Sequence, residues 1–447
     1  MMWKSKKISS RNYKLKAWLR RGPPTQMQKY MEKYHELQRI LNTLLVISVI
    51  SCTAPISILR SCRSRAHYLL HLVWMTFWYG FFISASYWEF TRITLQKVSL
   101  DRYLNAVESA IYVIHIASIL LLTLQWRNRI SHVLEDIVKS DMERGYSLDC
   151  NRSRRFIRFQ LLLIWTFTCL AISVDFWSKK CDKIRAALSI TSFVMPNIIS
   201  GLSFAQYYVL LREIAWRQEK VTECLERELF LSPLPRKAEI QKFRLQHAEL
   251  THFTRLVNRS YQYSILLLFV GCFLNFNLVL FLAYQGVENP GQTDWPNGIY
   301  MLLWLAMHMG KVISILYFNQ KVLGEHSRCL IVLNEAPNPH NDLQETINHF
   351  ILQLNTDVRQ HVVAGVISLD LKFLTTVSLK LTNLYILAVV FYQSGYLNRD
   401  VDRFSSYQRY LGHYLTDSTA EYLKRLVDRF SSNLHQNLGT KYFFDFF

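Results

Sequence analysis

QLLLIWTFTCLAISVDFW, residues 160–177, is an apolar run in which Asp175 is the only charged residue. A helix crosses the roughly 30 Å hydrocarbon layer of a membrane with about 20 mainly apolar residues, because its own hydrogen bonds satisfy the backbone there. This run has the length and composition of such a helix. Similar runs are residues 40–59, 68–88, 104–126, 188–211, 263–284, 299–318 and 374–397. The sequence therefore predicts an all-α, polytopic membrane protein.

The composition agrees with a membrane protein and argues against nucleic-acid binding. Half of the 447 residues are hydrophobic and 19% are charged, against about 25% charged residues in an average soluble domain. The chain has 52 Lys and Arg against 33 Asp and Glu, which gives a net charge of +19. These basic residues lie mainly between the apolar runs, where positive charge orients a membrane protein. No segment resembles a compact nucleic-acid module, so we expect contact with lipid and none with nucleic acid.

Positive charge also indicates how many of the eight runs cross the membrane, because Lys and Arg in short loops stay on the cytoplasmic side. If all eight cross, the basic stretches 127–158 and 212–260 both fall outside. If run 40–59 does not cross, both stretches are cytoplasmic, and loop 285–298, which lacks Lys and Arg, is extracellular. Run 40–59 contains a proline and several hydroxyl residues, which suits a re-entrant or interfacial helix. We therefore predict seven transmembrane helices, with the N-terminus inside and the C-terminus outside.

This topology divides the chain into consecutive segments. They are a basic cytoplasmic N-terminus (1–39), a re-entrant helix (40–59), transmembrane helices 1–4 (60–211), a cytoplasmic helical anchor loop (212–262), transmembrane helices 5–6 (263–318), a cytoplasmic loop and helix (319–373), transmembrane helix 7 (374–397) and an extracellular tail (398–447). The basic segment 179–185 is an exception, because it falls outside. Asn151 and Asn258 begin glycosylation acceptor triplets in cytoplasmic segments, so both should stay unmodified.

Ionisable side chains within the apolar runs are candidates for function, because such groups are costly in lipid unless they are paired or face water. Glu108 suits either a ligand or ion pathway or a position at the membrane interface. Asp175 lies close to an interfacial tryptophan and is expected to reach the headgroups. His71, His115 and His308 lie on three different runs and have no partner ligands at metal-binding spacing. We therefore expect three packed histidines and no metal.

Motifs of enzymes are missing from the sequence. It contains no nucleotide-binding loop, no G-x-S-x-G and no paired catalytic carboxylates. Its eight cysteines form no C-x-x-C pair and no spacing with histidine that would bind zinc. We therefore expect neither an enzyme nor a bound cofactor.

The most specific motif is VVAGVISLDLKFLTTVSLKLTNLYILAVVFYQ, residues 362–393. It resembles the C-terminal signature of insect gustatory receptors, in which A-G-x-F-x-[LV]-[DN] precedes an apolar helix that ends near T-T-Y-L-V-I-L-x-Q-F. The matching residues are Ala364, Gly365, Leu369, Asp370, Thr382 and Phe391. Ile367 replaces the family phenylalanine, and the family glutamine falls on Val390, with Gln393 nearly one turn further on.

The resemblance implies a homotetrameric, ligand-gated cation channel that is inverted relative to G-protein-coupled receptors. In this family the last helix of each subunit lines one central pore. The expected pore-lining residues are Thr382, Leu387, Val390, Phe391 and Gln393. Leu387, Val390 and Phe391 share one helix face, and four such faces would form an apolar constriction that stops ions by dewetting. The same face suits packing against neighbouring helices equally well.

The resemblance also implies a tastant pocket that opens from the outside between the earlier helices of each subunit. The outer halves of these helices present a mixture of aromatic and hydrogen-bonding groups that suits a small organic ligand. The candidate ligand-binding residues are Glu108, Tyr112, Asn197, Asn275, Tyr300 and Trp304. Each of them suits helix–helix packing equally well.

Together, these features predict a gustatory chemoreceptor subunit that forms a tastant-gated, non-selective cation channel. We expect it in the plasma membrane of sensory neurons, as a homotetramer or a hetero-oligomer with related receptor subunits, and with no need for a G protein. A multi-spanning small-molecule transporter is the alternative. An inverted internal repeat with broken helices would favour the transporter, and the sequence shows no such repeat.

Overall fold

The computed structural model describes residues 24–54, 65–94, 100–144, 150–178, 183–232, 235–288, 295–337, 341–357, 362–363 and 367–368. The chain forms two compact units, Met1–Gln360 and His361–Phe447. The first unit contains all the described helices, and the second contains the two described strands.

The helices of the first unit are α2 (Pro24–Ile50), α3 (Arg65–Thr94), α4 (Leu100–Arg144), α5 (Cys150–Ser178), α6 (Lys183–Ser189), the π-helix η3 (Ile190–Val194), α7 (Met195–Phe230), α8 (Lys237–Glu288), α9 (Trp295–Asn334) and α10 (Asn341–Asp357). Helix α8 has 52 residues, and at 1.5 Å per residue it is about 78 Å long. That is more than twice the roughly 30 Å of hydrocarbon in a bilayer. The long helices therefore extend well beyond any membrane that they cross.

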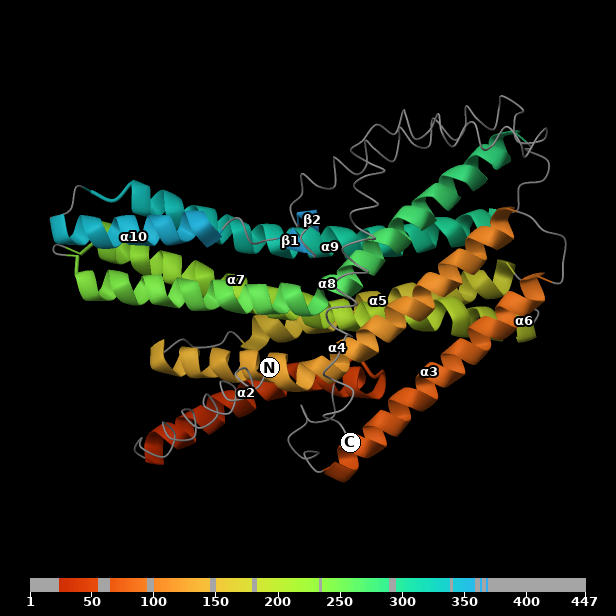
Figure 1. Cartoon of the computed structure of the whole chain (residues 1–447), viewed down its shortest axis with the longest axis horizontal. Coiled ribbons are helices and arrows are strands. Elements are labelled where there is room, and N and C mark those ends of the chain that lie inside the picture. The colour runs from red at the N-terminus through yellow and green to blue at the C-terminus, as the bar shows by residue number, and fades with distance from the viewer. Residues whose placement is uncertain are drawn as a thin grey trace, which may run out of the picture. The chain divides into compact units, whose positions relative to one another are not determined.

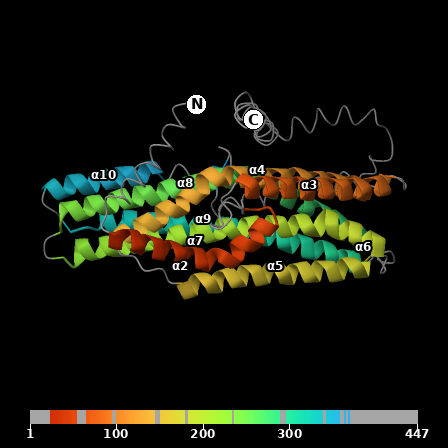
Figure 2. The same ribbon diagram turned by 90° about the horizontal axis from the view of Figure 1, so that it is seen from below.

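The long helices run side by side within this unit (Figures 1 and 2). Helix α10 lies against α8 and α9 at one end of the bundle, and α6 lies at the opposite end. An apolar cluster that includes Leu225, Ile240, Cys329 and Phe350 joins α7, α8, α9 and α10 at the first of these ends. We call the α10 end of the bundle the anchor end.

Helix α7 forms the centre of the bundle and packs on α5, α8 and α9. Every residue from 200 to 211 is buried. The π-helix η3 precedes α7, and the Met195 N–H bonds to the Ile190 carbonyl, five residues earlier. Pro196 explains this wider turn, because proline cannot donate the usual helical hydrogen bond and its ring crowds the carbonyl four residues back.

Large apolar side chains cover the outer faces of α3 and α5. Leu70, Val73 and Phe77 on α3 are exposed, as are Leu162 and Trp165 on α5. Soluble proteins rarely expose so much contiguous apolar surface. These faces are suited to contact with lipid.

The lengths and compositions of the helices also fit a membrane. Four described stretches are long and apolar enough to span one: Ala66–Trp88, Asn151–Trp177, Ala186–Phe230 and Gly298–Asn334. Shorter apolar stretches are Arg39–Ile50 in α2 and Glu108–Leu124 in α4. The predicted seventh span, 374–397, lies outside the described residues.

Helix α2 begins at Pro24, earlier than the re-entrant run expected from residue 40, and ends at Ile50, whose side chain is exposed. The last carbonyls of a helix have no partner within it. Here the Val49 carbonyl meets His71 Nε2 at 3.3 Å, and the Ile50 carbonyl accepts a hydrogen bond from Trp74 Nε1 at 3.0 Å. These contacts with α3 therefore satisfy the last two carbonyls of α2.

Two buried polar joints hold the long helices together. The first is a closed ring of hydrogen bonds between Tyr207 on α7, Asn258 on α8 and Asn319 on α9. The Tyr207 hydroxyl donates to Asn258 Oδ1 at 2.8 Å, and Asn258 Nδ2 donates to Asn319 Oδ1 at 3.0 Å. Asn319 Nδ2 closes the ring by donating to the Tyr207 hydroxyl at 2.7 Å. In the second, Arg217 on α7 donates to both carboxylate oxygens of Asp141 on α4, at 2.8 and 2.6 Å. The Arg217–Asp141 pair is almost completely buried.

The second unit contributes a short antiparallel hairpin, described only in its two strands. Strand β1 (Val362–Val363) pairs with β2 (Ile367–Ser368), so that Val363 lies opposite Ile367. Within the segment 319–373, a helix was expected from Asn355 to Asp370. The structure instead has α10, which ends at Asp357, followed by these two strands. The branched side chains of Val and Ile suit a strand better than a helix.

Candidate ligand-binding site

All six residues predicted to bind ligand are buried in one region of the bundle. Glu108 and Tyr112 come from α4, Asn197 from α7, Asn275 from α8, and Tyr300 and Trp304 from α9. Their helices pack against one another. We call this group, together with His308 and Lys311 on α9, the polar cluster.

A chain of short hydrogen bonds runs through the polar cluster. The Tyr112 hydroxyl donates to Glu108 Oε1 at 2.7 Å and lies 2.8 Å from His308 Nε2. A hydroxyl has one proton, so His308 Nε2 must be the donor in the second bond. His308 Nδ1 then acts as an acceptor, and it has no partner among the described residues. The Asn275 amide lies beside the same Glu108 carboxylate.

Lys311 adds a cation to the cluster that the sequence analysis overlooked. Its Nζ donates to Asn197 Oδ1 at 2.8 Å, and it lies 3.4 Å from the Asn197 carbonyl oxygen and 3.5 Å from Ser200 Oγ. A lysine within an apolar run is costly unless it is paired or faces water. The rule that identified Glu108 therefore also identifies Lys311, which lies in run 299–318.

One face of α9 carries most of these groups. Tyr300, Trp304, His308 and Lys311 follow at intervals of three or four residues, which places them on a single helix face. Such a face moves as one body when the helix shifts or rotates. A ligand that contacts one of these side chains is therefore coupled to the whole length of α9.

Aromatic rings enclose the polar groups. The rings of Tyr300 and Trp304 lie 5.4 Å apart between centroids, and Tyr112 meets Phe193 of η3 edge-on at 6.1 Å. These residues belong to a buried apolar cluster that also includes Phe82 of α3. Rings of this kind supply contact area for the apolar part of a ligand, while the polar groups fix its orientation.

Asp175 and the histidines differ in how well the sequence predicted them. The prediction that Asp175 reaches the headgroups is wrong, because its side chain is buried and its Oδ1 accepts a hydrogen bond from Ser189 Oγ at 2.8 Å. His71, His115 and His308 are all buried, as expected for packed histidines. The described residues contain no group of three His, Cys, Asp or Glu side chains that could hold a metal ion.

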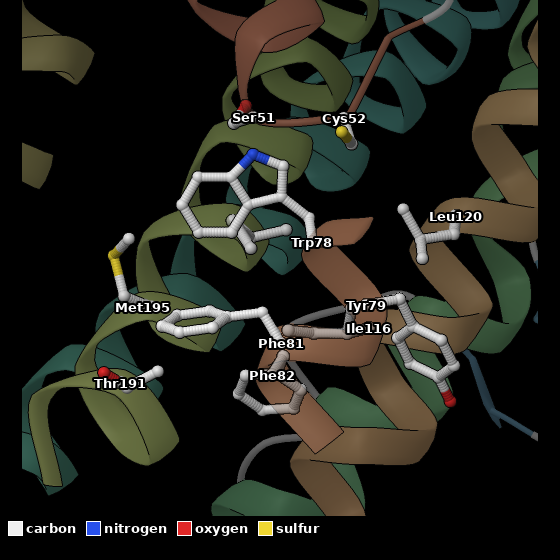
Figure 3. Close-up of a pocket in the computed structure, with 11 residues that line it drawn as sticks. Ser51, Cys52, Trp78, Tyr79, Phe81, Phe82, Ile116, Leu120, Thr191 and Met195 are labelled. Atoms are coloured by element: carbon white, nitrogen blue, oxygen red, sulfur yellow. The ribbon is translucent and has the colours of Figure 1, made fainter. Parts of the chain in front are cut away.

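A hollow lined by aromatic residues adjoins the polar cluster through Phe82 and Ile116. Its volume, including its open mouth, is about 370 Å³, and α3, α4, the start of α7 and residues 51–52 line it. Figure 3 shows the Trp78 ring below the turn formed by Ser51 and Cys52, with its indole nitrogen facing that turn. This nitrogen has no hydrogen-bond partner among the described residues. The hollow therefore presents an apolar wall with one buried hydrogen-bond donor.

The predicted pore-lining residues Thr382, Leu387, Val390, Phe391 and Gln393 lie outside the described residues. The site therefore consists of the polar cluster and the aromatic hollow beside it. The site offers a carboxylate, an ammonium group, an imidazole and amides within an aromatic enclosure, and this combination suits the binding of a small organic molecule.

Known proteins match this chain along most of its length. The sequence profile described as 7tm Chemosensory receptor matches residues 37–387. A Drosophila melanogaster protein that carries the name gustatory receptor 59f is 60% identical over 348 residues, which cover 78% of this chain and 86% of that protein. A second Drosophila protein, named as gustatory receptor 59e, is 36% identical over 96 residues, 21% of this chain and 24% of its own length.

Solved structures show the same fold. The insect olfactory receptor OR5 from Machilis hrabei matches with a TM-score of 0.56 at 14% sequence identity, over 79% of this chain and 98% of that receptor. The structure of the same receptor in complex with eugenol matches with a TM-score of 0.58 at 12% identity, over 80% of this chain and 99% of that receptor. The all-α fold of this protein is therefore that of an insect seven-helix chemoreceptor. This chain belongs to the 7tm chemosensory receptor family and, within it, to the insect gustatory receptors, membrane proteins that are not an enzyme family.

Proposed function

We propose that the protein is a subunit of a tastant-gated, non-selective cation channel in the plasma membrane of sensory neurons, and that the tastant binds at the polar cluster. The observation that carries the proposal is the convergence of all six predicted ligand-binding residues, with His308 and Lys311, in one buried region. Buried ionisable groups in a membrane protein mark functional sites more often than structural ones.

The chemistry of the cluster suggests the class of tastant. The carboxylate of Glu108 accepts hydrogen bonds, the ammonium group of Lys311 donates them, and the rings of Tyr300 and Trp304 provide apolar contact. The preferred ligand is therefore a small organic molecule with an aromatic or aliphatic body and at least one hydroxyl, carbonyl or carboxyl group. The complex of the related olfactory receptor with eugenol supports a small organic ligand for this fold.

We further propose an inverted topology with a cytoplasmic N-terminus, a re-entrant α2 and an extracellular C-terminus. At the end of α2, His71 and Trp74 of α3 meet the carbonyls of Val49 and Ile50, which supports a helix that ends against α3 and does not cross the membrane. The final helix, 374–397, would line the pore of a homotetramer or of a hetero-oligomer with related subunits. Leu387, Val390 and Phe391 would form the apolar gate, and Thr382 and Gln393 would add polar groups along the pore.

Voltage-clamp recording from cells that express the chain, with a panel of small organic tastants, tests this function. We expect a ligand-evoked cation current, and we expect Tyr112→Phe to raise the half-maximal concentration about tenfold. The lost hydroxyl bonds both Glu108 and His308, and a hydrogen bond to a charged group contributes about 1.5–3 kcal/mol. Tyr317→Phe is the matched control, because it removes the same hydroxyl from an exposed tyrosine on α9 that does not belong to the polar cluster.

Surface labelling of each variant separates loss of binding from loss of folding. An unchanged concentration dependence in a Tyr112→Phe receptor that reaches the surface would place the tastant elsewhere. Saturable uptake of a substrate with no current would show a transporter and overturn the channel.

A further inference from the structure

A second hollow, lined by basic residues, lies between α5, α7 and α9. Its lining consists of Arg152, Ser153, Arg212, Glu213, Trp216 and Lys321, and its volume, including its open mouth, is about 340 Å³. We propose that this basic hollow binds the phosphorylated headgroup of an anionic membrane phospholipid. It is separate from the polar cluster, with which it shares no residue.

Contacts within the hollow hold its cationic groups in place. The Arg212 guanidinium lies over the Phe156 ring, 4.4 Å from the centroid, and its Nη2 donates to the Arg152 carbonyl oxygen at 3.3 Å. These contacts hold the planar guanidinium at the wall of the hollow. Arginine binds phosphate through two parallel N–H groups, and lysine adds a mobile positive charge.

The carboxylate in the hollow does not cancel its positive character. Glu213 Oε1 accepts a hydrogen bond from Ser153 Oγ at 2.7 Å, and Glu213 Oε2 lies 3.2 Å from Nη1 of the buried Arg217. Both oxygens of Glu213 are therefore engaged by Ser153 and by Arg217, a guanidinium that Glu213 shares with Asp141. Arg152, Arg212 and Lys321 outnumber it by three charges to one.

The hollow lies at the depth of the lipid headgroups. On α5, the exposed apolar side chains begin at Phe159 and Leu162, about two turns beyond Arg152. Trp216 lines the hollow, and Tyr317 is exposed on α9 one turn from Lys321. Tryptophan and tyrosine concentrate at the membrane interface, and long cationic side chains reach from that depth to the headgroups. A phosphate attached to an acyl chain on α5 would therefore meet the three cations.

Under the proposed topology this end of α5 faces the cytoplasm, where the leaflet carries anionic lipids. The first turns of α5 hold Arg154, Arg155 and Arg158 in addition to Arg152, which would raise the local concentration of such lipids. The identity of the leaflet rests on the proposed topology. Recognition of a phosphorylated headgroup by the hollow does not.

Native mass spectrometry of the full-length receptor in detergent tests the proposal. The probes are a phosphatidylinositol bisphosphate, phosphatidylcholine and soluble inositol trisphosphate, each titrated against the wild type, the double variant Arg212→Gln/Lys321→Gln, and Arg155→Gln. We expect the wild type to bind the bisphosphate lipid more tightly than phosphatidylcholine. Each cation near the surface strengthens binding about fivefold without any specific site, so diffuse attraction alone would give a loss of about 25-fold for two charges. We expect the double variant to exceed that loss.

Arg155→Gln is the matched control, because it removes one charge from the same turn of α5 at an exposed position outside the hollow. It should weaken binding no more than about fivefold, the loss expected for one cation near an anionic membrane surface. The same loss per charge removed in Arg155→Gln and in the double variant would show diffuse attraction to a basic surface and overturn the site. Equal affinity for soluble inositol trisphosphate and for the lipid would show a site for a free phosphorylated ligand and overturn the assignment to a membrane lipid.

Discussion

Two buried polar regions of the bundle differ in how completely their groups are paired. In the ring of Tyr207, Asn258 and Asn319, each side chain both donates to and accepts from another member. In the polar cluster, by contrast, the described residues offer no partner to His308 Nδ1 or Asn275 Oδ1. A closed ring has nothing left to offer a ligand, whereas an open cluster has buried groups that a ligand can satisfy. Burial of polar groups alone therefore does not distinguish these two regions, whereas the state of pairing does.

The largest effect is expected at the buried ion pair of the anchor end. Asp141→Ala would leave the Arg217 guanidinium buried with Glu213 as its nearest remaining carboxylate. Removing one partner of a buried pair costs about 3–5 kcal/mol. Thermal unfolding of the purified receptor should show a large drop in Tm, and little of the variant should reach the cell surface.

Arg328→Ala is the control for this variant, because the Arg328–Glu226 pair is half exposed. Such surface pairs contribute less than about 1 kcal/mol. Similar Tm values for Asp141→Ala and Arg328→Ala would show that the buried pair does not stabilise the bundle.

A smaller effect is expected when the closed ring is broken. Asn258→Ala leaves Tyr207 and Asn319 short of partners, and unsatisfied buried groups of this kind cost about 1–3 kcal/mol. The Tm should fall, but the half-maximal tastant concentration should stay the same, since the ring does not belong to the polar cluster. Tyr112→Phe should show the reverse pattern. A shift of tastant sensitivity in Asn258→Ala would remove the distinction between the two regions.

Asn258 also connects this comparison to topology. Its side chain is buried in the ring, so a sugar on Asn258 is incompatible with the folded bundle. Asn151, in contrast, is exposed at the start of α5 and is the informative reporter of sidedness. A mobility change on deglycosylation that disappears in Asn151→Gln would contradict the proposed cytoplasmic position of this segment.

The sequence predicted the helical fold and the members of the polar cluster better than it predicted their contacts. Hydropathy located the apolar runs, and aromatic and polar residues within them located Glu108, Tyr112, Asn197, Asn275, Tyr300 and Trp304. The pairing of Asp141 with Arg217 joins residues 76 positions apart, and no local pattern contains that information. Asp175 was misjudged for the same reason, because its partner Ser189 belongs to α6, the next helix along the chain.

The start of α2 and the β-hairpin were missed on different grounds. Residues 24–39 are polar, and hydropathy detects only the apolar part of α2, which begins at Arg39. The strands at Val362 and Ile367 lie in the motif that resembles the family signature, and the resemblance does not specify the local backbone structure of that motif. The signal that could have predicted the strands is the strand propensity of their Val and Ile residues.

The smallest effect concerns acid stability at the anchor end, where His247 on α8 is fully buried against His326 and Phe350. Burial lowers the pKa of His247 from 6.5 to about 3, and the neighbouring His326 makes a smaller contribution in the same direction. Above pH 6.5 the imidazole is neutral in both the folded and the unfolded chain, so it does not affect stability there. As the pH falls below 6.5, the unfolded chain binds a proton that the folded chain does not, and stability is lost at about 1.4 kcal/mol per pH unit.

His247→Leu should therefore reduce the loss of Tm between pH 7.5 and pH 5.5, by an amount that corresponds to about 1 kcal/mol. His349→Leu on α10 is the control, because it removes an exposed histidine from the same end of the bundle. Equal pH profiles for the wild type and His247→Leu would mean that water reaches this histidine in solution. Solvent would then reach the centre of the anchor end. The anchor end could no longer be contrasted, as a closed region, with the polar cluster.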